Sequence, residues 1–170
     1  MRTDAVRRSS RWMEPLLLFA VAAGIFIADQ TAKALVMTGI GLNERVRVVG
    51  DLVQLWHVRN SGAAFSLFQG GTLLFLVVTV LALGMIVYFH REFRGRSPWL
   101  QVLLGVILGG TAGNLVDRIR FGYVTDFVSV GVGELRWPTF NIADSSIVIG
   151  IGVLVAYLLL TDRRRQELGA

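Results

Sequence analysis

Four long apolar runs alternate with polar segments along the chain. The runs extend over about Pro15–Met37, Gly71–Phe89, Pro98–Val116 and Asn141–Leu160. Each has close to the roughly 20 mostly apolar residues that a helix needs to cross the hydrocarbon core of a bilayer. The pattern predicts an all-α membrane protein with four transmembrane helices. Its length suits one domain, so we interpret residues 1–170 as a single integral membrane domain.

The two longer connections, about residues 38–70 and 117–140, carry patterns of their own. Val46–Val58 is rich in Val, Leu and Trp and contains the turn signal Gly50-Asp51, which predicts a small β-hairpin. Aromatic side chains in the second connection favour a segment at the membrane interface. These side chains and a neighbouring valine are Phe121, Tyr123, Phe127, Val130 and Trp137. We expect a small β-sheet and an interfacial loop segment, both extracytoplasmic.

The basic residues indicate how the helices are oriented. The chain is 54% hydrophobic with a formal net charge of +5. Nucleic-acid binding is not expected, because the arginines form short clusters beside apolar runs without interleaved aromatics. Basic residues concentrate in the cytoplasmic loops of membrane proteins. With four helices, the clusters in residues 2–11, 91–96 and 163–165 share one side. Both termini are therefore expected in the cytoplasm.

Cysteine and histidine usage limits the possible metal chemistry. The sequence has no cysteine, so disulfides and thiolate metal sites are impossible. Its two histidines, His57 and His90, fall in different segments and cannot form a two-histidine helical metal motif. We expect neither a metal nor a cofactor.

Polar residues gather near the outer ends of the apolar runs. Ionisable side chains inside a membrane are costly unless paired or hydrated, so each is a candidate functional residue. Asp29, for example, lies roughly 22 Å along the first helix from Glu14, at about 1.5 Å per residue. The inner halves of the runs are nearly pure Leu, Val, Ile, Ala and Gly. The candidates at the outer level are Asp29, Lys33, Asn60, Asn114, Asp117, Arg118, Asp126, Asn141 and Asp144.

Several of these residues also have purely structural interpretations. Three pairs have the spacing of local contacts, namely the ion pairs Asp29–Lys33 and Asp117–Arg118 and a helix cap formed by Asn141 and Asp144. Asn60-Ser61-Gly62 is an ordinary turn signal. Glycines repeat every four residues in the third run and indicate close helix packing, at Gly105, Gly109 and Gly113.

Two aspartates suggest a particular chemistry. Two carboxylates held together at a water-accessible site cannot both ionise easily, so one keeps a proton. The ionised group can take a proton from water while the protonated one polarises a peptide carbonyl, which hydrolyses the bond without a metal or a nucleophilic side chain. Asp126, in the second outer loop, and Asp144, at the start of the fourth run, form such a pair. Spacing alone leaves Asp117 as a competing candidate.

Three other functions fit parts of the pattern. A serine–lysine signal peptidase would use Lys33 as the base and Ser61 or Ser145 as the nucleophile. However, an acid one turn away keeps Lys33 protonated. A lipid-alcohol phosphotransferase needs several acids for metal ions, and Asp117-Arg118 with Asp126 is only a fragment of that pattern. A small transporter or scaffold would use the carboxylates to relay protons or to fix helix packing.

Five short motifs occur in order between residues 29 and 145. They are Asp29-Gln30-Thr31-Ala32-Lys33, Asn60-Ser61-Gly62-Ala63-Ala64-Phe65, Gly113-Asn114-Leu115-Val116-Asp117-Arg118, Val124-Thr125-Asp126-Phe127 and Phe140-Asn141-Ile142-Ala143-Asp144-Ser145. Any one motif is weak, but five in this order with four predicted helices are highly specific. In these motifs the sequence resembles the lipoprotein signal peptidase (signal peptidase II) family.

The resemblance implies an aspartic endopeptidase of the bacterial cytoplasmic (inner) membrane, with its active site near the outer face. Such an enzyme removes the signal peptide of a prolipoprotein by cutting just before a cysteine that carries diacylglycerol. The family's catalytic pair matches Asp126 and Asp144. Supporting or substrate-contacting residues match Asn60, Gly62, Asn114, Asp117, Arg118, Asn141, Asp29 and Lys33.

The resemblance also implies partners. Prolipoprotein substrates and membrane lipids are expected to contact the protein, and globomycin-type cyclic peptides are expected to inhibit it. A monomer is expected because the polar residues of one chain suffice for the site. We also hypothesise that the glycines of the third run let the substrate's signal helix approach closely.

Overall fold

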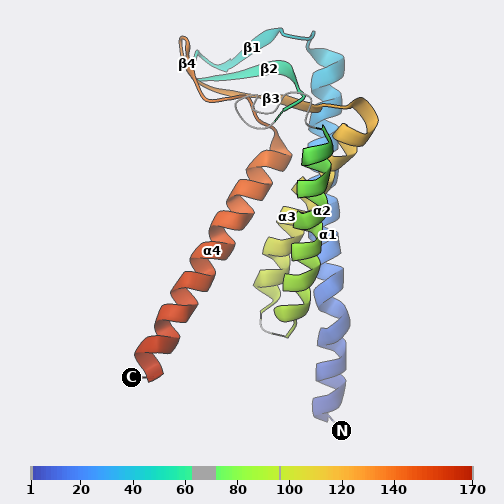
Figure 1. The fold of residues 1–170 in the computed structure, drawn as a ribbon, viewed down its shortest axis with the longest axis vertical. Helices are drawn as coiled ribbons and strands as arrows, with labels where there is room; N and C mark the ends of the chain where they lie inside the picture. The colour runs from blue at the N-terminus through green and yellow to red at the C-terminus, as the bar shows by residue number, and fades with distance from the viewer. Residues whose placement is uncertain (1, 63–71, 96, 170) are drawn as a thin grey trace.

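The chain folds into a set of long helices with a small sheet across one end (Figure 1). The computed structural model describes residues 2–62, 72–95 and 97–169, which form four helices and four strands. The helices are α1 (Arg2–Gly39), α2 (Thr72–Glu92), α3 (Pro98–Phe121) and α4 (Ile142–Gly169). The strands are β1 (Arg45–Val49), β2 (Val53–Asn60), β3 (Val124–Val132) and β4 (Leu135–Arg136). Both termini lie at the end of the molecule away from the sheet (Figure 1).

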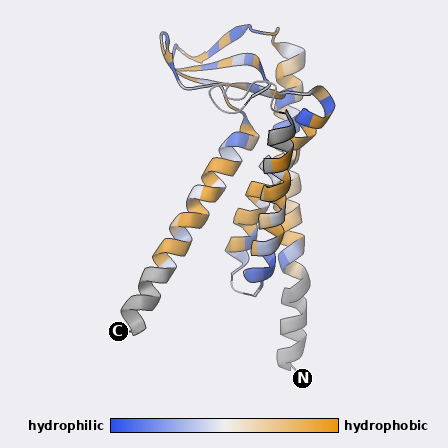
Figure 2. Ribbon diagram, in the orientation of Figure 1, coloured by the Kyte–Doolittle hydropathy of each residue, from blue (hydrophilic) through white to orange (hydrophobic). Residues whose placement is uncertain are grey.

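Three of the predicted membrane segments are confirmed as helices long and apolar enough to cross a bilayer. Within the described residues these segments are Met13–Gly39, Pro98–Phe121 and Ile142–Thr161. Figure 2 shows mostly apolar residues along these helices, with polar residues at helix ends, and a mixture of apolar and polar residues along the strands of the sheet. The fourth predicted segment corresponds to α2, a helix of 21 residues, and its passage through the membrane remains a prediction. Gly71, where that segment was predicted to begin, lies outside the described residues.

α3 is the central helix and packs against α1, α2 and α4. It starts at Pro98, whose ring suits the first helical turn. It ends where Gly122 adopts a left-handed conformation with φ of 77° and donates its N–H to the carbonyl of Arg118. Apolar side chains of all four helices and of the α2–α3 connection form one buried cluster, made of Leu18, Ile86, Phe93, Leu100, Leu103, Leu104, Ile107 and Leu154.

The glycines of α3 allow close contact between helices, as their spacing predicts. A Cβ atom on Gly105 would lie 2.6 Å from the carbonyl oxygen of Leu18, and one on Gly109 would lie 2.5 Å from that of Ala22. The packing interpretation of the glycines is therefore confirmed. Because α1 already occupies this face, the hypothesis that a substrate helix approaches these glycines is wrong.

The sheet is antiparallel with the strand order β1-β2-β3-β4. The predicted hairpin is confirmed, because β1 pairs with β2 and Val46 lies opposite Leu55. The sequence does not predict β3 and β4 in the second connection, where only an interfacial segment is expected. Leu55 pairs in turn with Val128 of β3, so the two connections form one sheet. Phe127 is buried there, whereas Trp137 is exposed.

A buried carboxylate fastens α1 to the α2–α3 connection at the end of the molecule away from the sheet. Both carboxylate oxygens of Glu14 accept the backbone N–H of Gly95, at 3.0 and 3.1 Å. Gly95 has a φ of 76°, which glycine adopts without the strain of a side chain. This contact holds α1 against the α2–α3 connection at the end of the molecule away from the sheet.

Candidate active site

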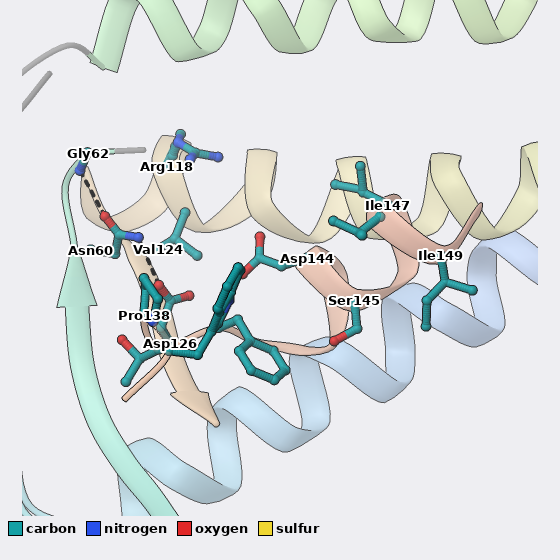
Figure 3. Close-up of a pocket in the computed structure, with 14 residues that line it drawn as sticks. Asn60, Gly62, Arg118, Val124, Asp126, Pro138, Asp144, Ser145, Ile147 and Ile149 are labelled. Atoms are coloured by element: carbon teal, nitrogen blue, oxygen red, sulfur yellow. Dashed lines mark hydrogen bonds between the residues drawn. The ribbon is translucent and has the colours of Figure 1, made fainter. Parts of the chain in front are cut away.

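Asp126 lies in β3 and is almost completely buried, with 1% of its surface exposed. It pairs across the sheet with Val58 beside an irregularity in β2. Its Oδ2 accepts a hydrogen bond from Asn60 Nδ2 at 2.8 Å, and its Oδ1 accepts one from Asn141 Nδ2 at 2.7 Å. Asn60 is itself held at the end of β2, because its Oδ1 accepts the N–H of Gly62 at 3.0 Å (Figure 3).

Asp144 lies in the first turn of α4 and takes part in the cap of that helix. The Asp144 N–H donates to Asn141 Oδ1 at 2.9 Å, and the Asn141 N–H donates to Asp144 Oδ2 at 3.1 Å. This reciprocal pair is the predicted cap, which is confirmed. The other carboxylate oxygen of Asp144 accepts a hydrogen bond from Asn114 Nδ2 of α3 at 2.7 Å. The cap therefore fixes Asp144 without removing it from the site.

Asn141 links the two aspartates directly. The residue is completely buried. Its side-chain oxygen caps the helix that carries Asp144, while its side-chain nitrogen donates to Asp126. The same nitrogen also lies 3.2 Å from Asn114 Oδ1. One amide side chain thus holds the carboxylates of β3 and α4 in a single hydrogen-bonded group.

Both aspartates line one cavity of about 470 Å³ between β3, α3 and α4. Asn60, Arg118, Asp126 and Asp144 are grouped at one end of it, and Ile147 and Ile149 lie farther along α4 (Figure 3). The volume falls within the range of about 300 to 1,000 Å³ that is common for ligand sites. The remaining wall is largely apolar and is formed by Gly62, Val124, Trp137, Pro138, Thr139, Phe140, Ser145 and Val148.

The electrostatics of the site favour one retained proton near neutral pH. Burial and the neighbouring charge of Asp144 raise the pKa of Asp126 to about 7. The hydrogen bonds from Asn60 and Asn141 and the charge of Lys33 act in the opposite direction on that pKa. Arg118 also interacts electrostatically with both aspartates from α3. A carboxyl group with such a pKa can exchange a proton at physiological pH.

Behind the aspartates lie three buried charges that we call the Lys33 cluster, namely Asp29, Lys33 and Asp117. Lys33 Nζ lies 2.8 Å from Asp29 Oδ2 and 3.0 Å from Asp117 Oδ2. It also donates to Asn114 Oδ1 at 3.0 Å. The predicted Asp29–Lys33 ion pair is therefore confirmed, and Asp117 joins it from α3.

Comparison with known proteins identifies the family. The family model described as Signal peptidase (SPase) II matches residues 21–160. The chain belongs to the signal peptidase II family. The protein is therefore a membrane peptidase of lipoprotein processing that removes signal peptides from prolipoproteins.

Individual relatives align with this chain over most of their own length. The lipoprotein signal peptidase of Halothermothrix orenii is 39% identical over 142 residues, which cover 84% of this chain and 94% of the relative. That of Rhodococcus jostii is 43% identical over 152 residues, covering 85% and 73%. A solved bacterial membrane enzyme, determined by the in meso method, matches with a TM-score of 0.78 and 30% identity and covers 86% of this chain and 88% of that one.

The predicted site residues of this signal peptidase II fall into two layers. One layer lines the cavity, with Asn60, Gly62, Arg118, Asp126 and Asp144. The other lies behind it and holds the first layer through hydrogen bonds and ion pairs, with Asp29, Lys33, Asn114, Asp117 and Asn141. The rest of the Asn60 motif, Ala63-Ala64-Phe65, lies outside the described residues.

One contributor to the second layer is not predicted from the sequence. Gln30 Nε2 lies 3.0 Å from Asp117 Oδ1 and 3.3 Å from Asp29 Oδ2, so it bridges the two carboxylates of the Lys33 cluster. Its signal in the sequence is a further polar side chain within the first apolar run, next to Asp29. Among the described residues, no group of three or more His, Asp or Glu side chains is arranged to hold a metal ion.

Proposed function

We propose that this signal peptidase II is an aspartic endopeptidase whose catalytic pair is Asp126 and Asp144. The observation that carries the proposal is that both carboxylates line one cavity and share Asn141 as a hydrogen-bonded partner. The bond cut lies just before the diacylglyceryl-modified cysteine of a prolipoprotein, as the motif resemblance implies.

In the proposed reaction the pair holds one proton before the substrate is attacked. The ionised carboxylate takes a proton from water, and the resulting hydroxide attacks the peptide carbonyl carbon. The protonated carboxyl group donates its proton to the carbonyl oxygen, giving a neutral tetrahedral diol. The diol then collapses and its C–N bond breaks. The carboxylate that gave its proton to the carbonyl oxygen takes a proton from a diol hydroxyl, and the carboxyl group that took a proton from water gives it to the leaving amine. The pair titrates as a unit, so the proton belongs to the pair and not to one residue.

The arrangement in the membrane supports this chemistry. We place the sheet and the cavity near the outer face of the bacterial inner membrane, with both termini in the cytoplasm and α2 as the fourth span. The basic clusters and the separation of the sheet from the termini support this placement (Figure 1). Lipid on the substrate cysteine would hold the scissile bond beside the aspartates. The reacting groups would then already be in place, so no separate encounter between them is needed.

Other properties follow from the same proposal. The protein acts as a single-domain monomer in contact with membrane lipids, because one chain supplies both aspartates. Globomycin-type cyclic peptides inhibit it by occupying the cavity. A serine–lysine mechanism is disfavoured, because Lys33 Nζ is already bound to Asp29, Asp117 and Asn114.

The deciding experiment measures cleavage of a diacylglyceryl prolipoprotein in detergent by the wild type, Asp126→Asn and Asp144→Asn. Asparagine keeps the shape of aspartate but cannot titrate, so both folded variants should lose nearly all activity. Glu134→Gln is the matched control, because Glu134 is an exposed acid in the turn before β4. Substantial activity in either aspartate variant would refute the catalytic pair.

A further inference from the structure

The Lys33 cluster buries three charges without lining the cavity. Asp29, Lys33 and Asp117 are at most 2% exposed. None of them belongs to the described residues that line the cavity around the aspartates. Buried ion pairs are costly to desolvate and often stabilise a fold no better than apolar residues would. Stability alone is therefore a weak explanation for placing this cluster inside the bundle.

The two carboxylates of the cluster bind backbone groups next to the catalytic pair. Asp29 Oδ1 accepts the N–H of Ala143 at 2.9 Å, and Ala143 directly precedes Asp144. Asp117 Oδ2 accepts the N–H of Thr125 at 3.2 Å, and Thr125 directly precedes Asp126. Each carboxylate thus fixes the backbone at the base of one catalytic aspartate.

Lys33 joins these two contacts. Its Nζ lies within 3.0 Å of both carboxylates, and Gln30 Nε2 bridges the same two groups from the preceding turn of α1. Lys33 Nζ also donates to Asn114 Oδ1, and Asn114 Nδ2 donates to the Asp144 carboxylate. Three connections therefore run from one ammonium group in α1 to the two catalytic residues.

We propose that the Lys33 cluster is a positioning device, which sets the placement of Asp126 relative to Asp144 by binding the amides of Thr125 and Ala143. This inference rests on the proposed function, in which the two aspartates act as a pair. Asp29, Lys33 and Asp117 touch no substrate in this view and act only through Asp126 and Asp144. A displacement of about 1 Å at reacting groups can cost roughly 100-fold in rate.

The test compares alanine with asparagine at positions 29 and 117. Asp29→Ala and Asp117→Ala each release one backbone amide, and kcat should fall by roughly 100-fold while KM stays close to the wild-type value. Asp29→Asn and Asp117→Asn remove the same charge but keep an oxygen that can accept the amide. The asparagine variants should therefore recover most of the lost kcat. Asparagine variants as slow as the alanine variants would overturn the proposal, since charge would then be what matters.

Glu14→Ala is the matched control for a structural role. Glu14 is also a buried carboxylate of α1 that accepts a backbone N–H, but it lies fifteen residues before Asp29 and contacts the α2–α3 connection. Its loss should lower the thermal unfolding midpoint and leave kcat unchanged. All rates are measured on monodisperse protein well below each unfolding midpoint. If Asp29→Ala and Asp117→Ala behave as Glu14→Ala does, the cluster serves only stability and the proposal fails.

A double variant covers the case in which an alanine variant does not fold. Lys33→Met with Asp29→Asn removes one positive and one negative charge, so the net charge of the cluster is preserved. It leaves acceptors at residues 29 and 117 but removes the ammonium group that joins them. A lower kcat with an unchanged KM is expected, and a wild-type kcat would overturn the proposal.

The outcomes separate this inference from the catalytic assignment. If the assignment fails, Asp126→Asn or Asp144→Asn retains activity whatever the cluster variants do. If only the positioning inference fails, both of those variants are inactive while Asp29→Ala and Asp117→Ala cleave at the wild-type rate.

Discussion

At the scale of single residues, burial, a neighbouring charge and hydrogen-bond donors act in opposite directions on the pKa of Asp126. Asn60 and Asn141 both donate to Asp126, and such bonds favour the ionised form. Burial and the charge of Asp144 have the larger effect, and the pKa of Asp126 is raised to about 7. The balance between these opposing effects places the pKa of Asp126 near physiological pH.

Loss of the Asn60 hydrogen bond should shift the pH dependence of cleavage. In the wild type, kcat/KM should decline as pH rises past about 7, the pKa of Asp126, because the pair then loses the one proton that it must keep. Asn60→Ala removes a donor that favours the carboxylate, so the pKa of Asp126 rises and the alkaline decline should move to higher pH. The check is to measure kcat/KM of the wild type and of Asn60→Ala from acid to alkaline pH. A decline that moves to lower pH would contradict the assigned role of Asn60, and Glu134→Gln should not move it.

The two roles of Asn141 can be separated by substitution. Asn141→Ser keeps a side-chain oxygen for the N–H of Asp144 but lacks the nitrogen that donates to Asp126. Asn141→Ala loses both contacts and should cost about 1 kcal/mol more in cap stability than serine does. We expect both variants to cleave slowly and only the alanine variant to show the full loss of unfolding midpoint. Cleavage by Asn141→Ser at the wild-type rate would show that the bond to Asp126 is dispensable.

At the scale of elements, the close contact between α1 and α3 determines how near the polar side chains of α1 lie to those of α3. α3 lies against α1 through Gly105 and Gly109, where a Cβ atom would strike backbone carbonyl groups. Farther along, a Cβ on Gly113 would lie 2.5 Å from Asp29 Oδ2. The absence of side chains at these positions lets α1 bring Asp29 and Lys33 up to α3. The same glycines that pack the helices therefore also admit the Lys33 cluster.

Filling the α1–α3 contact should destabilise the protein strongly. The added methyl of Gly109→Ala would lie 2.5 Å from the carbonyl oxygen of Ala22 and 2.7 Å from Ile25 Cβ. Such overpacking typically costs about 1 to 3 kcal/mol, because backbone must move. Gly84→Ala in α2 is the control, since a Cβ there meets nothing within 4 Å. Thermal unfolding in detergent should show a lower midpoint for Gly109→Ala alone, and equal midpoints would contradict the packing.

Local pattern predicts the helices well and the sheet only in part. Apolar runs near 20 residues leave few alternatives in a bilayer, so α1, α3 and α4 follow from the sequence. α3 nevertheless continues past Val116, the predicted end, to Phe121, because buried partners accommodate Asp117. β3 was missed because its main partner is β2, which precedes it by more than sixty residues. A pairing between such distant segments leaves no periodic signal that a window of sequence can reveal.

At the scale of the whole molecule, candidate residues from three helices and two strands meet beneath one end of the sheet. Their residue types and order along the chain indicate the cluster, since ionisable residues in apolar runs require partners. The amide contacts of Asp29 with Ala143 and of Asp117 with Thr125 could not be predicted in this way. Backbone groups carry no side-chain signature, and their pairing depends on how the helices pack against the sheet.

The orientation of the whole molecule gives the last prediction. Because the chain has no cysteine, single cysteines report position without background. We expect Glu134→Cys, in the turn before β4, to react with a membrane-impermeant maleimide in intact spheroplasts. Arg91→Cys, in the last turn of α2, should react only after permeabilisation. This result places the sheet outside and requires α3 to cross the membrane. Because β2 belongs to the same sheet as β3 and β4, the chain between Asn60 and Arg91 must then cross as well, through α2. Labelling of both cysteines in intact spheroplasts would exclude both α2 and α3 as spans, and labelling of Arg91→Cys alone would invert the orientation.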